Sequence, residues 1–532
     1  MKKYKIITLA LLAMISFNSC SDFLTTELTD KKTTNTYYNT SAEAYTALVG
    51  CYNGLDLIWN SGTALPVSSE VLSDNCFGGT GSSDGYAYQL MDEFNKAVSP
   101  ADVSIYGNNW KNYYQAIFRC NVLLGKLEQV KWDTSTVALK TQYQAEARFI
   151  RAFCYFDLVR LFEKVPLVLT PTIAIVPQAT PAATYAQIMS DLRFAATNLP
   201  TAVYSSVASG RVTKWAAESL LARAYLFYDG YYGTGDNTIA IGGETGVTAL
   251  AAVEDVISKS GHSLVPDFNT LWPAASIGKT VTYAGENNPE VVFSIKYSST
   301  EDYNGNITGN EWMIMEGIRG SSYYPYQYGW GACTVDPKLY GTFNSGDSRQ
   351  FASITAIKEE GIANTPADKA GCREYTGYFL KKYSPLCDKN GVSIVTSFMT
   401  GQYQDYFAIR YADVLLMAAE LKSPNAQAYL DAVRTRAGVA TGIAPTKANI
   451  LAERQLEFVG EGIRYWDLLR QGVTTAASTI ANNTTLSFLD DGHTAPTAAQ
   501  LQANITTTRG FQQIPNDQVT LSSGVLIQNA GW

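Results

Sequence analysis

A serine in a glycine-rich loop is the first group in this sequence that could do covalent chemistry. Residues 81–85 read Gly-Ser-Ser-Asp-Gly and match the G-x-S-x-G pattern of hydrolases, in which Ser83 would attack an acyl carbon. Such a nucleophile needs a strand before it, a helix after it and a histidine base. Both flanks are rich in glycine and serine, and the chain has only two histidines, His262 and His493. A secreted hydrolase is therefore an alternative function and not our main prediction.

Metal and acid–base chemistry have little support in the composition. Two histidines and no clustered cysteines leave few ligands for a transition metal. A structural calcium ion held by loop carboxylates remains open, and we expect no other cofactor. Two carboxylates could hydrolyse a glycoside, but 48 acidic residues supply such pairs in any case. We therefore predict that the chain is not an enzyme and has no catalytic residues.

The strongest indication of binding is an aromatic segment at residues 321–330, SSYYPYQYGW, in which Tyr324, Tyr326, Tyr328 and Trp330 alternate. One interpretation is the half-buried face of a strand. The other is an exposed aromatic platform, because sugars stack their apolar C–H faces on rings and need polar partners for their hydroxyls. Trp312, Glu316 and Arg319 lie close by in the sequence and could complete such a site.

The element around which the chain is organised lies at residues 451–472, LAERQLEFVGEGIRYWDLLRQG. Its apolar and charged residues recur at helical spacing, and Gly460 and Gly462 predict a bend at Glu461. Two pairs three residues apart, Glu461 with Arg464 and Asp467 with Arg470, are interpreted as structural ion pairs. On sequence grounds the charge ladder exceeds what internal pairing requires, which indicates a surface for a partner.

Helical periodicity recurs along most of the chain. The pattern Thr-Ser-Ala-Glu at 40–43 is a capping box that opens a helix to about residue 59. Residues 60–85 read as loop, 261–404 as loops with small hairpins and a strand-like run at 290–298, and 513–532 as an extended tail. The remaining expected helices cover 103–130, 137–162, 184–199, 213–228, 247–260, 409–421 and 425–437.

The first residues read as a secretory signal, with three lysines before a short apolar run that ends near Cys20. Cysteine at this point resembles the lipobox of bacterial lipoproteins, in which the thiol is acylated. Ser19 fits that pattern, whereas Phe17 and Asn18 fit it poorly. The polar residues 21–36 suit a tether, so we predict lipidation at Cys20.

The net charge and the cysteines after Cys20 bear on the possible partners and on the compartment of the protein. A net charge of −8 without a basic stripe argues against a nucleic-acid partner. Cys120 and Cys154 fall in apolar helical patterns and read as buried. Cys372 and Cys387 lie in loop-like sequence and could form a disulfide in an oxidising compartment.

With these segments in place, the chain resembles the SusD/RagB family of outer-membrane lipoproteins of Bacteroidetes. The sequence departs from the family pattern at Ala418, Gln455 and Val459-Gly460, none of which belongs to a predicted site. The similar stretches are AEARFIRAFCYFDLVRLFEKVPLVL at 145–169, AESLLARAYLFY at 217–228, RYADVLLMAAE at 410–420, residues 453–472, and residues 514–515 with 528–532.

The resemblance implies a mainly α fold, a superhelix of tetratricopeptide-like helix pairs, with a loop-rich irregular part that contains short β-hairpins and holds the ligand site. It also implies a surface-exposed protein, lipid-anchored in the outer membrane, that captures an oligosaccharide and delivers it to a SusC-like TonB-dependent transporter. Asp74 and Asn75, with Tyr86 and Tyr88, resemble the family's N-terminal contribution to the site.

The resulting predictions are an oligosaccharide-binding lipoprotein, with a peptide-binding protein of the same fold as the alternative. The expected parts are a signal peptide at 1–19, a lipidated tether at 20–40, an N-terminal helical part at 41–260, a ligand-binding part at 261–404 and a C-terminal helical part at 405–532. The predicted ligand-binding residues are Asp74, Asn75, Tyr86, Trp312, Tyr324, Tyr326 and Trp330.

Overall fold

The computed structural model describes residues 37–59, 63–208, 210–299, 308–363, 365–482 and 494–532. The predicted signal peptide, the lipidation site Cys20 and the second histidine, His493, lie outside these ranges.

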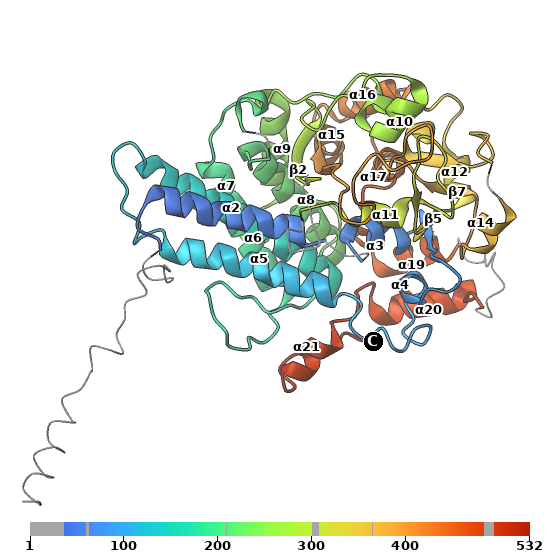
Figure 1. Cartoon of the computed structure of the whole chain (residues 1–532). Coiled ribbons are helices and arrows are strands. Elements are labelled where there is room, and N and C mark those ends of the chain that lie inside the picture. Colours follow the sequence, from blue (N-terminus) through green and yellow to red (C-terminus); the bar gives the residue numbers. More distant parts are fainter. Residues whose placement is uncertain (1–36, 60–62, 209, 300–307, 364, 483–493) are drawn as a thin grey trace, which may run out of the picture.

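The long helices of the first half of the chain stack in chain order at one end of the molecule, and most of the later helices lie with the short elements at the other end (Figure 1). This confirms the mainly helical, tetratricopeptide-like fold. The long helices of the first half are α2 (Ser41–Leu57), α5 (Gly107–Lys126), α6 (Val137–Phe162), α7 (Pro181–Asn198), α8 (Lys214–Tyr232) and α9 (Gly246–Lys259). The later ones are α15 (Tyr411–Glu420), α16 (Ala426–Ala437), α17 (Lys447–Glu457), α19 (Val473–Ala481) and α20 (Ala498–Thr508).

Threonine opens many of these helices. Thr40 accepts a hydrogen bond from the backbone N–H of Glu43, and the Glu43 carboxylate binds the backbone of Thr40, which confirms the predicted capping box. The same kind of threonine cap precedes five other helices, at Thr180, Thr213, Thr245, Thr446 and Thr497. Local sequence thus determines where these helices begin.

Helix α6 lies at the centre of the core. Every residue from Phe149 to Phe162 is buried, and the helix packs on α2, α5, α7 and α8. A helix that is buried all round needs apolar or internally paired side chains on every face. Asp157 meets this requirement because its carboxylate accepts hydrogen bonds from Arg160 at 2.6 Å and from Tyr113 at 2.8 Å.

The strands are short and join segments far apart in the sequence. They form a four-stranded sheet in the order β1-β5-β7-β6 and two two-stranded sheets, β2-β8 and β3-β4. The pairing of β1 with β5 and of β2 with β8 connects the segment at 261–404 to both helical parts. The predicted boundaries between these parts of the chain stay predictions. The strands are β1 (Cys76–Gly78), β2 (Val291–Ile295), β3 (Ile318–Arg319), β4 (Tyr328–Gly329), β5 (Cys333–Val335), β6 (Ile354–Ala356), β7 (Tyr378–Leu380) and β8 (Tyr406–Arg410).

The segments predicted as loop contain more structure than expected. The first loop holds a helix and a strand, the long middle segment holds several short helices, and the extended tail holds one helix. These elements have four to seven residues, too few to show a clear period. They are α3 (Leu65–Val71), η3 (Phe268–Leu271), α10 (Pro273–Lys279), α11 (Met313–Glu316), α12 (Pro337–Thr342), α13 (Ser348–Ser353), α14 (Pro366–Ala370) and α21 (Asn516–Leu521). A further short helix, α4 (Ala87–Asp92), follows directly after the first loop.

The central stretch at 451–472 is two helices and not one bent helix. Helix α17 ends at Glu457 and α18 (Arg464–Leu469) starts after a turn in which Gly460 and Gly462 have φ of +76° and +70°. The turn places the Glu461 carboxylate against Arg410 and Lys382, with an Arg410 Nη2–Glu461 Oε1 distance of 2.7 Å. The predicted pair of Glu461 with Arg464 is therefore wrong.

The other charges of this stretch are paired inside the protein. Asp467 and Arg470 form the predicted pair, with a nitrogen–oxygen distance of 2.8 Å. Arg464 binds Asp74 in the first loop at 2.7 Å, and Glu457 binds Arg410 and Arg436. All of these side chains are nearly or fully buried, so the charge ladder does not form an outer surface. The argument for a partner from this ladder is wrong.

The disulfide that the sequence left open between Cys372 and Cys387 is not formed. Cys372 and Cys387 are free and buried, and burial raises the pKa of the Cys372 thiol to about 12. The Cys387 thiol donates to the carbonyl of Tyr326 at 3.2 Å. Cys120 and Cys154 are buried as predicted.

Candidate functional site

The aromatic segment at 321–330 is folded around a tight turn. The backbone N–H groups of Tyr323 and Tyr326 each donate to the carbonyl of the other residue at 2.7 Å. Behind the turn, Tyr326 pairs with Leu386, and the Cys387 N–H donates to Pro325 at 2.9 Å. Since a turn interrupts the two-residue period of a strand, the four alternating rings do not share one face.

Two of the predicted platform residues are buried. Trp312 is fully buried and packs edge-on against Tyr383 and Tyr406, with ring centroids 5.0 and 5.7 Å apart. Tyr326 is 2% exposed, and its hydroxyl donates to the Glu360 carboxylate at 2.5 Å. Neither ring can present a face to an external ligand in this conformation. The prediction of an exposed platform is therefore wrong for Trp312 and Tyr326.

The exposed rings of the segment are Tyr324, at the turn, and Tyr328 on β4, with exposed fractions of 48% and 39%. Tyr328 stacks on the half-buried ring of Phe398, with centroids 4.5 Å apart and an interplanar angle of 30°. Its N–H donates to the Ser322 hydroxyl at 3.0 Å, which fixes the backbone beneath the ring. We call Tyr324, Tyr328 and Phe398 the aromatic surface; the half-buried Trp330 lies beside it in the sequence.

Asp74 and Asn75 connect the first loop to the C-terminal part. Asp74 forms a bidentate ion pair with Arg464, both nitrogen–oxygen distances being 2.7 Å. Asn75 is fully buried, donates to Glu70 at 2.8 Å and accepts from Gln455 at 3.0 Å. These contacts give both residues a role in the fold, and their role in ligand binding stays a prediction.

Tyr86 lies on the same loop, against the guanidinium of Arg373 at 3.9 Å from the ring centroid. The loop reaches the aromatic segment close by: Arg319 donates to Asp84 at 3.1 Å, and the Thr80 N–H donates to Gly331 at 2.8 Å. The structure therefore brings the first loop next to the aromatic segment, as predicted, although through other residues than Asp74 and Asn75.

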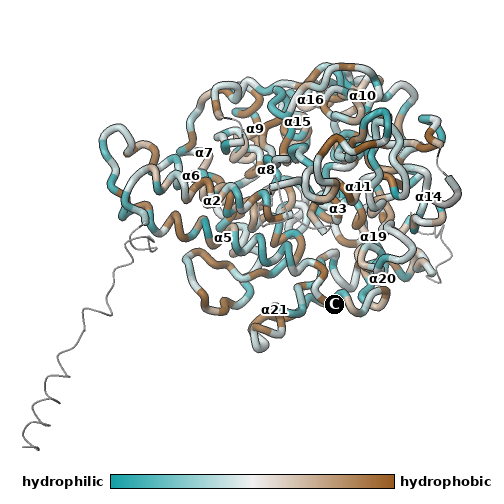
Figure 2. Tube along the Cα trace, in the orientation of Figure 1, coloured by the Kyte–Doolittle hydropathy of each residue, from teal (hydrophilic) through white to brown (hydrophobic). Residues whose placement is uncertain are grey.

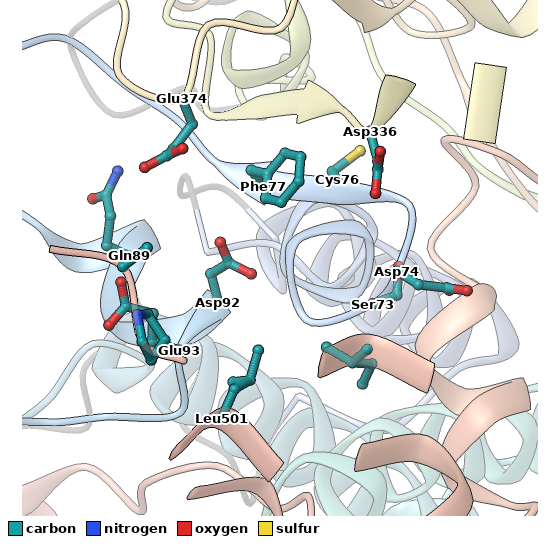
Figure 3. A pocket seen from close by; sticks show the side chains of 13 residues that line it. Ser73, Asp74, Cys76, Phe77, Gln89, Asp92, Glu93, Asp336, Glu374 and Leu501 are labelled. Carbon is teal, nitrogen blue, oxygen red and sulfur yellow. The ribbon is translucent and has the colours of Figure 1, made fainter. Parts of the chain in front are cut away.

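An acidic cavity lies behind the first loop (Figure 3). Its volume of about 40 Å³ has room for a few water molecules and not for a sugar ring. Burial raises the pKa of Asp92 well above its usual range and also raises that of Asp336. Burial thus disfavours the charged form of both carboxyls, which limits the repulsion in the cavity. Its carboxylates belong to Asp74, Asp92, Glu93, Asp336 and Glu374.

The G-x-S-x-G sequence forms a turn and not a nucleophile elbow. Arg373 donates to the carbonyls of Ser82, Asp84 and Gly85, so the turn serves as an attachment point for this arginine. Ser83 is exposed at the turn, whereas His262 is buried and hydrogen-bonded to Pro289. This geometry does not support the hydrolase alternative.

Metal binding and membrane insertion can be judged only for the described ranges. Within them, no group of three or more histidine, cysteine, aspartate or glutamate side chains is arranged to hold a metal ion. Calcium can also be held by backbone and amide carbonyl oxygens, so the structural calcium ion stays an untested possibility. No helix in the same ranges combines the length and apolar character needed to cross a bilayer.

Sequence reasoning missed Phe398, and it named Tyr328 without selecting it as a site residue. Phe398 stands 70 residues further along the chain than Tyr328, so their contact leaves no local pattern in the sequence. Tyr326 and Tyr328 occupy equivalent positions in the alternating pattern of the segment. The sequence therefore does not show that the turn leaves the Tyr328 ring exposed and the Tyr326 ring buried.

Comparison with known proteins identifies two profiles of one family in this chain. "Starch-binding associating with outer membrane" matches residues 68–226 and "SusD family" matches residues 358–532. SusD-like protein P38 of Formosa agariphila is 25% identical over 522 residues, covering 88% of this chain and 92% of that protein. A SusD-like protein of Bacteroides ovatus is 22% identical, covering 88% of this chain and 82% of that protein.

Solved structures share the fold over nearly the whole chain. A laminarin-binding SusD-like protein superposes with a TM-score of 0.71 at 28% identity, covering 93% of this chain and all of that one. Surface glycan-binding protein A of Bacteroides thetaiotaomicron superposes with a TM-score of 0.73 at 25% identity, covering 93% of this chain and all of that one.

Proposed function

The chain belongs to the SusD/RagB family, and from this we propose that it binds oligosaccharides at the cell surface and delivers them to a SusC-like TonB-dependent transporter in the outer membrane. The relative that binds laminarin, at 28% identity over nearly the whole chain, supports a glycan as the ligand class.

The observation that carries the proposal is the exposed stack of Tyr328 on Phe398, with Tyr324 on the same segment. An aromatic ring at the surface offers an apolar face to the C–H groups of a sugar. Since the backbone hydrogen bonds of the turn hold the segment in place, little conformational entropy is lost when a ligand binds.

The buried rings of the same region contribute by supporting this surface. Tyr326 anchors the turn to Glu360, and the buried Trp312 precedes α11, which packs on β4. In this proposal Tyr324, Tyr328 and Phe398 contact the sugar, whereas Trp312 and Tyr326 position the segment.

A glycan array probed beside a peptide panel tests this function. The glycans are laminari-, malto-, cello-, xylo- and mannohexaose. We expect the protein to bind laminarihexaose or another of these hexasaccharides and to bind no peptide. Binding to peptides alone would favour the peptide-binding alternative of the same fold. Hydrolysis of an ester or glycoside in the same wells would instead support the hydrolase.

The location follows from the family and from the predicted lipidation at Cys20. We propose that the chain is anchored by lipid and exposed on the outer membrane. Replacement Cys20→Ala should move the protein out of the membrane fraction and stop incorporation of labelled palmitate. Continued labelling of the variant would contradict lipidation at this residue.

The transporter needs a surface other than the internal charge ladder. Large apolar side chains are exposed on the loop between α6 and α7 and on the C-terminal tail, which lie on the same side of the molecule (Figure 2). Gln178 joins the two segments by accepting from the Ile527 N–H at 2.8 Å and donating to its carbonyl at 3.2 Å. We propose this loop–tail surface as the transporter contact, because such exposed apolar groups are typical of interfaces. It consists of Leu169, Ile173, Ile175, Leu521 and Ile527.

A further inference from the structure

A groove lies where α2, the short helix η2 (Tyr204–Ser206) and strand β2 meet. It consists of two hollows of about 350 and 370 Å³, which share Gly210, Arg211 and Ser294 and therefore adjoin. Each hollow lies within the range of about 300–1,000 Å³ that small-molecule sites occupy. None of the residues of the aromatic surface lines either hollow.

An aromatic platform stands at one end of the groove. The Tyr204 ring stacks on the imidazole of His262, with centroids 4.3 Å apart and an interplanar angle of 20°. His262 donates from Nδ1 to the carbonyl of Pro289 at 3.0 Å, and the Tyr204 N–H donates to Ser260 at 3.0 Å. Burial lowers the pKa of His262 to about 4, so the imidazole is neutral at physiological pH. Tyr204 is thus held rigidly while its remaining surface lines the hollow.

Arg211 supplies donors at the junction of the two hollows. Its Nε donates to Glu146 at 3.1 Å, and Nη2 binds the other oxygen of the same carboxylate. The Tyr52 hydroxyl also donates to the Glu146 carboxylate, with an oxygen–oxygen distance of 2.5 Å. Among the described residues nothing accepts from Nη1 of Arg211, which remains available to a ligand oxygen. The guanidinium is therefore fixed in place before any ligand arrives.

The rest of the groove mixes donors with acceptors. Lys296 stands opposite Gly210 and is held by Asn287 at 2.9 Å and Asp405 at 2.5 Å. Burial raises the pKa of both Asp56 and Glu286 to about 7, so these carboxyls lose much of their charge near neutral pH. A lining with both kinds of hydrogen-bonding group and no dominant charge suits a neutral ligand rich in hydroxyls.

We propose that this groove is a second oligosaccharide-binding site, in which a sugar ring stacks on Tyr204 and its hydroxyls bind Arg211 and the carboxyls near Lys296. The inference rests on the proposed function, because it assigns the same ligand class to a second place on the molecule. The two adjoining hollows fit a chain of sugars better than a single ring, since their combined length continues past Arg211.

Isothermal titration with the five hexasaccharides tests the groove through its stoichiometry. The wild-type protein should bind two molecules of the recognised hexasaccharide per chain, and Tyr204→Ala should bind one. Tyr204→Phe keeps the ring and loses only the hydroxyl, so it should still bind two. Tyr328→Ala should remove the other site and leave the one that depends on Tyr204.

A second variant keeps the test independent of the stability of Tyr204→Ala. Ala208 is exposed and lines the groove, so Ala208→Arg narrows it without removing a contact of the fold. This variant should melt at the wild-type temperature and bind one hexasaccharide. If the wild type binds one hexasaccharide and Tyr204→Ala and Ala208→Arg bind the same number, the groove is not a second binding site. The proposed function would still hold in that case. Absence of binding to every hexasaccharide would overturn both.

Discussion

Two tyrosines two residues apart should respond oppositely to truncation. Tyr326→Ala removes a buried ring and should lower the free energy of unfolding by about 3–5 kcal/mol. Tyr328→Ala removes an exposed ring and should change it by less than about 1 kcal/mol. Urea denaturation of the two variants measures both values. Equal losses of stability would show that the aromatic surface is part of the core.

At the residue scale, the sequence predicted which segment is aromatic but not which rings are exposed. Residue type indicates how much apolar area a side chain can bury, and Trp312 and Tyr328 both have large areas. The side to which a ring turns depends on partners distant in the sequence, such as Leu386 behind Tyr326 and Phe398 beside Tyr328. These partners form no periodic pattern with the segment itself.

At the element scale, two glycines of the turn between α17 and α18 provide a matched pair. Their φ values are nearly equal, so alanine at either should cost about 1–2 kcal/mol in backbone strain. A Cβ at Gly460 would meet only the Leu380 side chain at 3.4 Å, whereas a Cβ at Gly462 would lie 2.7 Å from the Pro66 Cα. Gly462→Ala should therefore be less stable than Gly460→Ala in urea, and equal midpoints would contradict the close packing of α3 on this turn.

The buried charges between α17 and β8 should make the fold sensitive to acid. Burial alone would raise the pKa of Glu457, but Arg436, Arg410 and Arg349 together outweigh it and lower this pKa to about 2. Because the folded value lies below the ordinary value of 4.5, the stabilisation is complete above pH 4.5 and is lost as the pH falls towards 2.

Urea unfolding between pH 2 and 6 measures this loss. Glu457→Gln should be less stable than the wild type at neutral pH and should lose less stability in acid. Glu128→Gln alters an exposed carboxylate and serves as the control, for which we expect the wild-type curve. Parallel curves for the wild type and Glu457→Gln would contradict the depressed pKa.

Most of the long helices were predictable from sequence, and among the strands β2 was anticipated by the strand-like run at 290–298. The helix at 137–162 was predicted with its observed bounds, because its apolar run is long and ends before Val165-Pro166. The other strands have two to five residues, and several pair with distant segments, as β1 does with β5, so the local sequence shows no period by which to predict them. The helix break at Gly460 and Gly462 was anticipated only as a bend, since positive φ at both glycines appears only in three dimensions.

At the scale of the whole molecule, the loop–tail surface should govern association with the transporter. Ile173→Ser combined with Ile527→Ser removes two exposed apolar groups and should leave the melting temperature unchanged. Pull-down from detergent-solubilised outer membrane should recover a β-barrel receptor with the wild type and much less with the double variant. Val247→Ser changes an exposed residue on α9 and serves as the control. Equal recovery with all three proteins would place the contact elsewhere.

The central claim is that the exposed rings of the aromatic surface bind an oligosaccharide. Isothermal titration of the recognised hexasaccharide into wild type and the double variant Tyr324→Ala, Tyr328→Ala tests it most directly, with thermal melts of both proteins as the control for folding. We expect both proteins to melt at nearly the same temperature and the double variant to lose binding at this surface. A double variant that folds normally and binds with the affinity and stoichiometry of the wild type would contradict the claim.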